Sequence, residues 1–409
     1  MRVEAFERLL TPDGQALLGE VEASADTESE LALGTRLRRA YDSDLVAAAI
    51  QQAGLRRKAV AKFGSDAAAM YFTSDGLEQA TRSPVAAHRA QRVRRHEIDS
   101  AIDLGCGIGG DLLALGRAGV TADGVDIDPL RTRIAAANLD ALALRGSVRV
   151  ADANTVDATE YGIAFVDPAR RDGRGRRFDP RQCTPDWDFV TGLLQRSAAA
   201  KVAPGIDHDL VPAGVEAEWV SDRGDLVEAC LWGMPLASSH RRATVLPSAA
   251  TLTEADAPGE AAVRAPGNYL YEPDDAVIRA HLVSAVVARA DGWLLDPHIA
   301  YVGSDRLVDT PFATAYEVVD ELPYREKQLR AALRSRDVGS LTVKKRGVDI
   351  VPDQLVARLK LRGSTPATIV MTRVDGAGRA YLVRRVRRDD GRSEPEQELG
   401  QPFGLRPER

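Results

Sequence analysis

The first part of the chain combines apolar residues at helical spacing with strong helix formers placed between polar capping residues. Thr11-Pro-Asp-Gly carries a capping hydroxyl with proline at the first helical position, and Ser43-Asp begins a run of helix formers that reaches Ala53. No run of alternating apolar and polar residues competes with these signals. Residues 1–97 are therefore predicted to form a helical N-terminal region.

From residue 98 the pattern changes to short apolar runs with helical stretches between them, which is typical of buried parallel strands in an α/β sheet. The first four runs begin at Ala101, Ala122, Val148 and Ile163. Further runs cover residues 201–207, 216–221, 225–232 and 242–247. Residues 98–250 are therefore predicted to form one domain around a Rossmann-like, seven-stranded sheet.

The first strand of this domain leads into a glycine-rich loop. Residues 101–111 read as a strand, a tight loop and the start of a helix. Gly105, Gly107 and Gly109 let the backbone approach a ligand that side chains would exclude, and the helix N-terminus offers unpaired N–H donors. We expect a ligand to bind at this loop.

Two classes of ligand use such a loop. Gly110 completes the spacing G-x-G-x-x-G, and Asp126 follows Gly105 by twenty-one residues, so a dinucleotide is one alternative. Asp103 argues against it, because a carboxylate at the strand end would face a pyrophosphate with like charge. The same carboxylate would neutralise the ammonium of an amino-acid ligand such as the methionine part of S-adenosylmethionine. We favour the second ligand, and a turn without a ligand is the remaining alternative.

The next three strands also end in acidic residues. Asp126, followed by Ile127, stands where a carboxylate accepts both ribose hydroxyls of a nucleoside. Asp152, followed by Ala153, can take an adenine amino group, and Asp167 ends the fourth strand. Because open α/β sheets hold ligands at the carboxyl ends of their strands, these acids are expected to converge on one crevice.

The order and spacing of these motifs, from about Ser100 to Pro247, resemble those of the class I S-adenosylmethionine-dependent methyltransferases. The resemblance implies a methyltransferase sheet with S-adenosylmethionine as the cofactor. It assigns cofactor binding to eight residues: Asp103, Gly105, Gly107, Gly109, Asp126, Ile127, Asp152 and Ala153. The segment from Lys62 to Arg92 resembles the one that precedes the first strand in bacterial relatives of trimethylguanosine synthase. In methyltransferases of this class the segment folds over the cofactor, which is what the resemblance implies here. The alternative is that Lys62, Phe63 and Tyr71 only pack in the core and form pairs within the protein.

The reaction is expected to occur after the fourth strand, at Asp167-Pro168-Ala169-Arg170. In amino-methylating relatives this position holds Asp or Asn, two prolines and an aromatic residue, which together hold an exocyclic amine. Here the second proline and the aromatic residue are absent, which argues against methylation of an exocyclic amine. The candidate catalytic residues are Asp167, Pro168 and Arg170, and Arg170 can hold a phosphate or stack on a base. Cys183 lies outside this motif, which argues against carbon methylation through a cysteine.

The distribution of charge suggests a polyanionic partner. The net charge of the chain is −6, yet residues 324–388 hold 17 Lys and Arg against 5 Asp and Glu, so this segment carries +12 and the remainder −18. Arg170, Arg171 and Arg174 form a second basic group after the fourth strand, and guanidinium groups match phosphate oxygens. Both groups are expected to contact RNA. The alternative for the basic segment is that it only docks on the acidic remainder of the chain.

The basic segment reads as a small α/β module over residues 323–390. It resembles the THUMP-like domain that follows a methyltransferase domain in some bacterial proteins, on Lys344-Lys345-Arg346-Gly and Leu359-Lys-Leu-Arg-Gly. THUMP domains bind RNA, so the resemblance implies RNA as the partner of this module. Residues 251–322 are expected to be a linker and connecting segment, and residues 391–409 a flexible tail.

Composition excludes several other functions. The three cysteines are far apart without a C-x-x-C motif and the six histidines are scattered, so neither a metal site nor a disulfide framework is expected. No apolar run approaches the roughly 20 residues of a membrane span, so a cytoplasmic location is expected. We therefore expect an S-adenosylmethionine-dependent methyltransferase that acts on RNA. A methyltransferase of a protein or small molecule and a non-catalytic RNA-binding protein are the alternatives.

Overall fold

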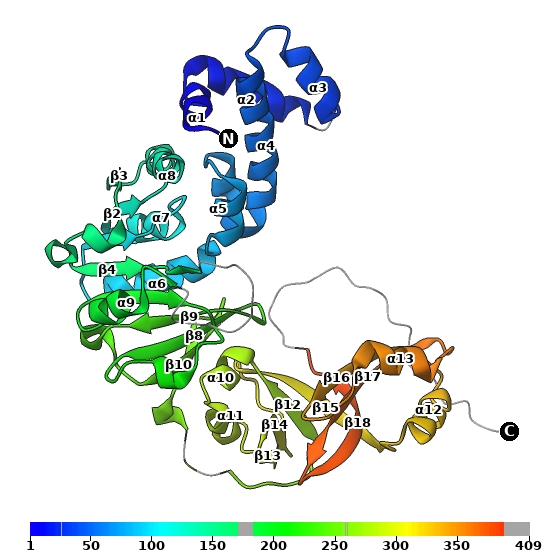
Figure 1. Cartoon of the computed structure of the whole chain (residues 1–409). Coiled ribbons are helices and arrows are strands. Elements are labelled where there is room, and N and C mark those ends of the chain that lie inside the picture. Colours follow the sequence, from blue (N-terminus) through cyan, green and yellow to red (C-terminus); the bar gives the residue numbers. More distant parts are fainter. Residues whose placement is uncertain (26, 171–182, 258, 260, 388–409) are drawn as a thin grey trace. The chain divides into compact units, whose positions relative to one another are not determined.

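The computed structural model describes residues 1–25, 27–170, 183–257, 259 and 261–387. The chain divides into two compact units (Figure 1). The first unit contains Met1–Ala261 and Pro273–Ala288, and the second contains Ala262–Glu272 and the chain from Arg289 onward. Each unit is built around its own large sheet.

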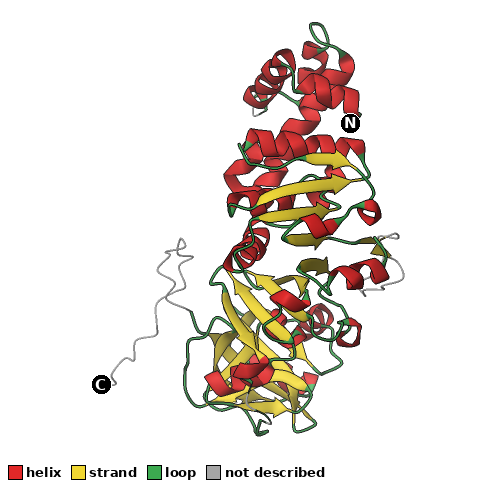
Figure 2. Ribbon diagram, turned by 90° about the vertical axis from the view of Figure 1, so that its left-hand side faces the viewer, coloured by secondary structure: helices red, strands yellow, loops and turns green. Residues whose placement is uncertain are grey.

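The N-terminal region is helical, as predicted, and its described residues contain no strand before residue 100 (Figure 2). Thr11 caps its helix as expected, because its hydroxyl accepts a hydrogen bond from Gly14 N at 3.3 Å. The cap of the long helix is Asp42 rather than Ser43, because the Asp42 carboxylate accepts hydrogen bonds from Asp44 N at 3.0 Å and Leu45 N at 3.3 Å, two N–H groups of the first turn. The helices are α1 (Val3–Leu9), α2 (Pro12–Ser24), α3 (Glu30–Leu37), α4 (Ser43–Phe63), α5 (Ser74–Gln79) and α6 (Ser83–Arg95).

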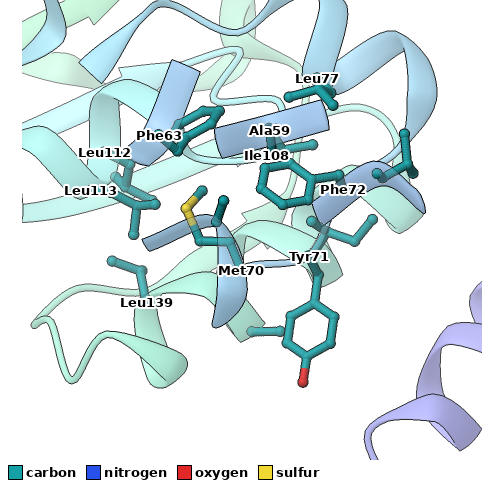
Figure 3. Close-up of a cluster of buried hydrophobic side chains, with 14 of the residues drawn as sticks. Ala59, Phe63, Met70, Tyr71, Phe72, Leu77, Ile108, Leu112, Leu113 and Leu139 are labelled. Carbon is teal, nitrogen blue, oxygen red and sulfur yellow. The ribbon is translucent and has the colours of Figure 1, made fainter. Parts of the chain in front are cut away.

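One apolar cluster joins this helical region to the glycine-rich loop and to the helix after the second strand (Figure 3). Phe63 and Phe72 contact each other with ring centroids 5.6 Å apart, and Met70 and Phe72 are fully buried. The cluster includes Ala59, Phe63, Met70, Tyr71, Phe72, Leu77, Ile108, Leu112, Leu113 and Leu139. The helical region therefore shares its core with the sheet that carries the loop.

The sheet of the first unit has nine strands in the order β11-β10-β8-β9-β7-β4-β1-β2-β3. Strands β1, β2, β3, β4 and β7 are parallel, and β9 runs antiparallel between β7 and β8. The Rossmann-like sheet is thus confirmed, but its described residues form nine strands rather than the expected seven: the run at 242–247 is β10, and β11 was not expected. The strands are β1 (Ser100–Leu104), β2 (Thr121–Asp126), β3 (Val148–Val150), β4 (Ile163–Val166), β7 (Ala198–Val202), β8 (Glu216–Asp222), β9 (Asp225–Trp232), β10 (Arg241–Leu246) and β11 (Ala250–Thr253).

Helices connect the parallel strands. They are α7 (Gly110–Arg117), α8 (Pro129–Ala141) and α9 (Trp187–Leu193), while α10 (Asp275–Arg279) and α11 (Val283–Arg289) follow later in the chain. The fifth strand was expected over residues 201–207, but β7 ends at Val202. The reason is that Pro204 cannot donate a ladder hydrogen bond and Gly205 adds no side chain to pack.

The sheet of the second unit has the order β13-β14-β12-β15-β18-β17-β16. Its strands are β12 (Tyr269–Pro273), β13 (Trp293–Asp296), β14 (Ile299–Ser304), β15 (Ala313–Leu322), β16 (Val338–Arg346), β17 (Thr365–Val374) and β18 (Ala377–Arg385). The helices of this unit are α12 (Glu326–Arg334) and α13 (Pro352–Leu359). Leu329 and Leu333 of α12 and Leu355 and Leu359 of α13 are buried in one apolar cluster with the sheet.

The stretch 251–322 differs from the expected linker, since it contains β12, β13, β14 and β15. These strands belong to the same sheet as the basic α/β module, so the second unit begins well before residue 323. β12, β13 and β14 have only 5, 4 and 6 residues, and an Ala-, Pro- and Glu-rich sequence precedes them, so their strand pattern was weak. The expected tail, residues 391–409, lies outside the described residues.

Candidate functional site

The glycine-rich loop after β1 has the backbone conformation that requires glycine. The φ angles are +98° at Gly105, +55° at Gly107 and +90° at Gly109. Residues with a side chain rarely adopt this backbone conformation. The N–H groups of Gly105 and Cys106 both donate to Val125 O, at 2.8 and 2.9 Å, which fastens the loop to β2. No atom lies within 4 Å of the position that a Cβ would take at Gly105 or Gly107. The described chain therefore leaves open space beside the loop, where a ligand can approach.

Asp126, the last residue of β2, is oriented by the backbone around it. One carboxylate oxygen accepts a hydrogen bond from Gly107 N at 3.0 Å and the other from Asp128 N at 2.9 Å. The side chain is buried, with 7% exposure of the residue. Each carboxylate oxygen keeps a second acceptor position, so Asp126 can still receive two hydroxyl groups from a ligand.

Asp103 lies in β1 directly before the loop and is 2% exposed. Within the described part of the chain, its Oδ1 has no hydrogen-bond partner. Burial, together with the nearby carboxylates of Asp111 and Asp167, raises the pKa of Asp103 well above its usual range. A buried carboxyl oxygen without a donor is costly, and a cationic group of a ligand would supply the missing partner.

The expected adenine contacts lie at the next two strand ends. Ile127 is 69% exposed, which is unusual for a large aliphatic residue and leaves its side chain free to cover a ring. Asp152 follows β3, and its Oδ1 accepts hydrogen bonds from the backbone and side-chain nitrogens of Asn154 at 2.9 and 2.8 Å. Ala153 is buried behind it. Asp152 thus shapes the turn, and one of its oxygens already has partners.

Asp167 follows β4 at the same edge of the sheet, and it is paired with a residue that the sequence analysis did not select. The Nζ atom of Lys201 on β7 lies 2.5 Å from Asp167 Oδ2. A lysine inside the apolar strand Ala198–Val202 was the available signal, because buried parallel strands are usually apolar throughout. Arg170 pairs through its backbone with Cys183 as part of β5 (Ala169–Arg170) and β6 (Cys183–Thr184). Arg171 and Arg174 lie outside the described residues.

Charged side chains from α6, α7 and β9 lie on the buried side of the ion pair between Asp167 and Lys201. Arg89 on α6 is 4% exposed and donates to both Asp111 on α7 and Glu228 on β9. Its guanidinium also lies over the Phe165 ring, 4.7 Å from the centroid. Burial raises the pKa of Glu228, although Arg89 and Lys201 oppose this. Sequence reasoning missed Arg89 and Glu228 because neither belongs to a local motif.

A second buried network ties α6 to the far strands of the sheet. Glu216 and Glu218 of β8 are fully buried, and Arg92 donates to Glu216 Oε1 at 2.5 Å and to Glu218 Oε2 at 3.0 Å. His88 Nε2 lies 2.8 Å from Glu218. Burial opposes ionisation, but hydrogen bonds from Arg92 and Arg242 outweigh it and lower the pKa of Glu216 to about 2. This network fixes α6 against the sheet.

The three basic residues of the second unit that were expected to bind RNA have different environments. Lys344 Nζ lies 2.6 Å from Glu272 Oε2, and the Arg346 guanidinium lies over the Tyr301 ring at 5.6 Å from its centroid. Lys345 is exposed on the other face of β16, as alternation along a strand requires. Only Lys345 of the three therefore presents its charge without such a partner.

Other features limit the chemistry of the described residues. No group of three or more His, Cys, Asp or Glu side chains is arranged there to hold a metal ion. No helix in the described ranges is long and apolar enough to cross a membrane. All three cysteines are buried, and burial raises the pKa of Cys106 and of Cys230 well above the usual range.

Comparisons with known proteins agree with this architecture. Residues 313–385 match the family model described as a THUMP domain-like domain, and residues 2–59 match a domain of unknown function. The crystal structure of a candidate methyltransferase from Porphyromonas gingivalis has a TM-score of 0.74 at 20% identity, and the alignment covers 90% of this chain and 97% of that one. At this identity it shows a shared fold.

Sequence comparison identifies the family. Uncharacterized S-adenosylmethionine-dependent methyltransferases from two strains of Mycobacterium tuberculosis are 40% identical to this chain over 335 residues, which cover 79% of this chain and 91% of each relative. The chain carries a THUMP-like domain toward its C-terminus. With its Rossmann-like sheet and glycine-rich loop, the chain belongs to the S-adenosylmethionine-dependent methyltransferases, and S-adenosylmethionine is its cofactor.

Proposed function

We propose that this methyltransferase acts on RNA, with the cofactor at the carboxyl edge of the first sheet and the second unit as the RNA-binding module. In this proposal Asp126 accepts the ribose hydroxyls and Asp103 Oδ1 accepts a hydrogen bond from the ammonium group. Ile127, Asp152 and Ala153 surround the adenine. The bound cofactor supplies a methyl group on a sulfonium centre, and the protein contributes mainly by positioning the acceptor.

The observation that carries the RNA assignment is a group of basic side chains on α12 and α13. The leucines of both helices are buried, whereas Arg334 on α12 and Arg358 on α13 are exposed and Arg330, four residues before Arg334, is half-buried. Arg334 Nη2 donates to Lys360 O at 2.9 Å, which brings the C-terminal ends of the two helices together. Lys360 and Arg362 follow α13 and are exposed.

Carboxylates neutralise little of this surface, which we call the helical basic surface: Arg330, Arg334, Arg358, Lys360 and Arg362. Glu326 is the carboxylate that pairs with Arg330 and Arg358, at 3.3 and 2.9 Å. Among the described residues, no ion pair involves Arg334, Lys360 or Arg362. Several unpaired cations on one face of a THUMP-like domain suit a phosphate backbone.

This proposal assigns the RNA contacts of the second unit to residues other than Lys344 and Arg346. Lys344 and Arg346 are committed to Glu272 and Tyr301, so Lys345 and the helical basic surface are the better candidates. Arg170, Arg171 and Arg174 remain proposed as a clamp nearer the site of methyl transfer. The catalytic role proposed for Asp167 and Pro168 also remains, and a cytoplasmic location fits an RNA substrate.

The proposal is tested with RNA from cells that have and lack the protein, grown with a mass-labelled methyl donor. Nucleoside mass spectrometry should find one methylated nucleoside that disappears in the deleted strain and returns with the wild-type gene. Asp126→Ala serves as the matched control that keeps the protein but weakens cofactor binding, and it should not restore the signal. Unchanged RNA nucleosides, with methyl label instead in protein or metabolites, would contradict the proposal.

A further inference from the structure

Lys201 and Asp167 are brought together by the register of two neighbouring strands. Strands β4 and β7 are parallel, and Val166 lies opposite Ala200, so the next residues along each strand are Asp167 and Lys201. Their side chains form an ion pair at 2.5 Å. Exposure of the Asp167 side chain is 37% and that of the Lys201 side chain 18%, so the carboxylate is the outer member of the pair.

Lys201 keeps its charge in this position. Burial lowers the pKa of an ammonium group, but the carboxylates of Asp167, Glu228 and Asp111 outweigh it, and the pKa of Lys201 is raised. Lys62, on the last turn of α4, is a different case, because its Nζ donates to the carbonyls of Leu77, Glu78 and Ala80 at 2.7, 2.5 and 3.0 Å. All three of its donors are used, so Lys62 holds the end of α5.

A fixed ammonium group beside Asp167 discriminates between acceptor atoms. An exocyclic amine gains positive charge as it is methylated, so a cation a few ångströms away would slow the reaction, on the order of a hundredfold or more in a partly buried site. The positively charged amine would also compete with Lys201 for the Asp167 carboxylate. A hydroxyl group instead loses a proton and gains negative charge on oxygen, which an ammonium group stabilises.

The cysteines argue against a carbon acceptor that needs a thiolate. Cys183 is 1% exposed, and burial raises the pKa of Cys106 and Cys230, so each of these two thiols stays protonated. Within an unmodified RNA chain the hydroxyl groups are those of the ribose, with a 2′-hydroxyl on every nucleotide. Of the amine, carbon and hydroxyl acceptors, the ribose hydroxyl is the one whose methylation an ammonium group beside Asp167 assists.

We propose, on the basis of the RNA function proposed above, that the enzyme methylates a ribose 2′-hydroxyl with Asp167 and Lys201 as a catalytic pair. The acceptor oxygen bonds to the methyl carbon as the carbon–sulfur bond breaks, and the bonding electron pair stays on sulfur. The hydroxyl proton passes to the Asp167 carboxylate and then to water. Lys201 stabilises the charge that develops on oxygen and holds Asp167 toward it. The products are a methyl ether and S-adenosylhomocysteine.

The first experiment locates the methyl group. Full-length protein is incubated with RNA from the deleted strain and methyl-tritiated S-adenosylmethionine, and the RNA is hydrolysed in alkali. A 2′-O-methyl group removes the hydroxyl that attacks the neighbouring phosphate, so the label should appear in alkali-resistant dinucleotides. Label in mononucleotides would mean base methylation and would overturn this inference while leaving the RNA function intact. RNA that takes up no label would overturn the RNA function itself.

The second experiment tests the pair. Lys201→Met should lower kcat by about a hundredfold or more, as loss of one group that stabilises an oxyanion does, while cofactor affinity by calorimetry stays within about threefold. Lys201→Arg keeps the charge and should recover part of the turnover. Asp167→Asn should also lose turnover while cofactor affinity stays within about threefold. Lys58→Met, which removes an exposed lysine of α4, is the control.

The outcomes separate catalysis from a structural role. A Lys201→Met enzyme that turns over at the wild-type rate would overturn the catalytic pair. So would an Asp167→Asn enzyme whose kcat matches that of the wild type. A merely structural ion pair would lower cofactor affinity and turnover together in all three variants, and would not respond to the charge-conserving replacement.

Discussion

Asn138 on α8 holds the backbone of Tyr71 at both polar groups. Its Oδ1 accepts a hydrogen bond from Tyr71 N at 2.7 Å, and its Nδ2 donates to Tyr71 O at 3.1 Å. The same Nδ2 donates to Ile108 O at 2.9 Å, inside the glycine-rich loop. One buried amide therefore connects the helical N-terminal region to the glycine-rich loop, and Asn138 is fully buried.

Asn138→Ala should destabilise the first unit. The change leaves three buried backbone groups without partners, and each costs about 1–3 kcal/mol, so the loss should be roughly 3 kcal/mol or more. Urea unfolding followed by tryptophan fluorescence measures it. Asp140→Ala, an exposed change on the same helix, is the control and should stay within about 0.5 kcal/mol. Equal free energies of unfolding of the two variants would show that the hydrogen bonds of Asn138 contribute little to stability.

Asp126→Ala should weaken S-adenosylmethionine binding about tenfold or more, because it removes charge-assisted hydrogen bonds worth roughly 1.5–3 kcal/mol. It also frees Gly107 N from its anchor. Calorimetric titration measures the affinity. Asp123→Ala on the same strand is the matched control, because Asp123 binds Ser147 and Tyr161 rather than the loop. An Asp126→Ala affinity equal to that of the control would exclude the ribose assignment.

The free energy of unfolding should fall in acid because of Glu216. Its pKa is about 2 in the folded protein and near 4.5 in the unfolded chain, so the unfolded state takes up a proton first as the pH falls. The stabilisation is complete above pH about 4.5 and is lost between about 4.5 and 2, and it amounts to roughly 3 kcal/mol. Urea unfolding at pH 6 and pH 3.5 measures part of this change.

Two variants separate this effect from the general loss of stability in acid. Glu216→Gln should flatten the pH dependence, whereas Glu4→Gln, at an exposed position on α1, should leave it as steep as in the wild type. If the free energy of unfolding of Glu216→Gln depends on pH as steeply as that of the wild type, the network around Arg92 does not cause the loss of stability in acid.

RNA binding should depend steeply on salt, and the dependence should come from the helical basic surface. Replacing Arg334, Lys360 and Arg362 with Ala should reduce the log–log salt slope by about two to three units, close to one unit for each phosphate that these side chains neutralise. Replacing Lys344 and Arg346 with Met should leave the slope unchanged, since Glu272 and Tyr301 already engage them. Filter binding between 50 and 300 mM salt, roughly the range over which such slopes are read, measures both. If the Lys344 and Arg346 variant reduced the slope and the other variant did not, the RNA interface would be assigned to β16.

Local sequence was enough to predict the glycine-rich loop and its backbone conformation. Gly105, Gly107 and Gly109 stand where the backbone takes positive φ angles, and this requirement is written into single residues. Asp103, Asp126 and Asp167 could be placed at one edge because parallel strands bring their carboxyl ends together once the alternation of strands and helices is recognised. The charge of the basic module was likewise visible from composition.

The partners of these residues depended on the tertiary structure. Lys201 lies 34 positions after Asp167, Asn138 lies 67 after Tyr71, and Lys344 lies 72 after Glu272. Such pairings follow from which strands become neighbours and in what register, and no local propensity or spacing encodes that choice. Local patterns were therefore sufficient to predict the glycine-rich turn, the acidic strand ends and the family. Only the packing of distant segments decided which cation faces Asp167 and which basic residues stay unpaired, because those depend on interactions formed when the whole chain folds.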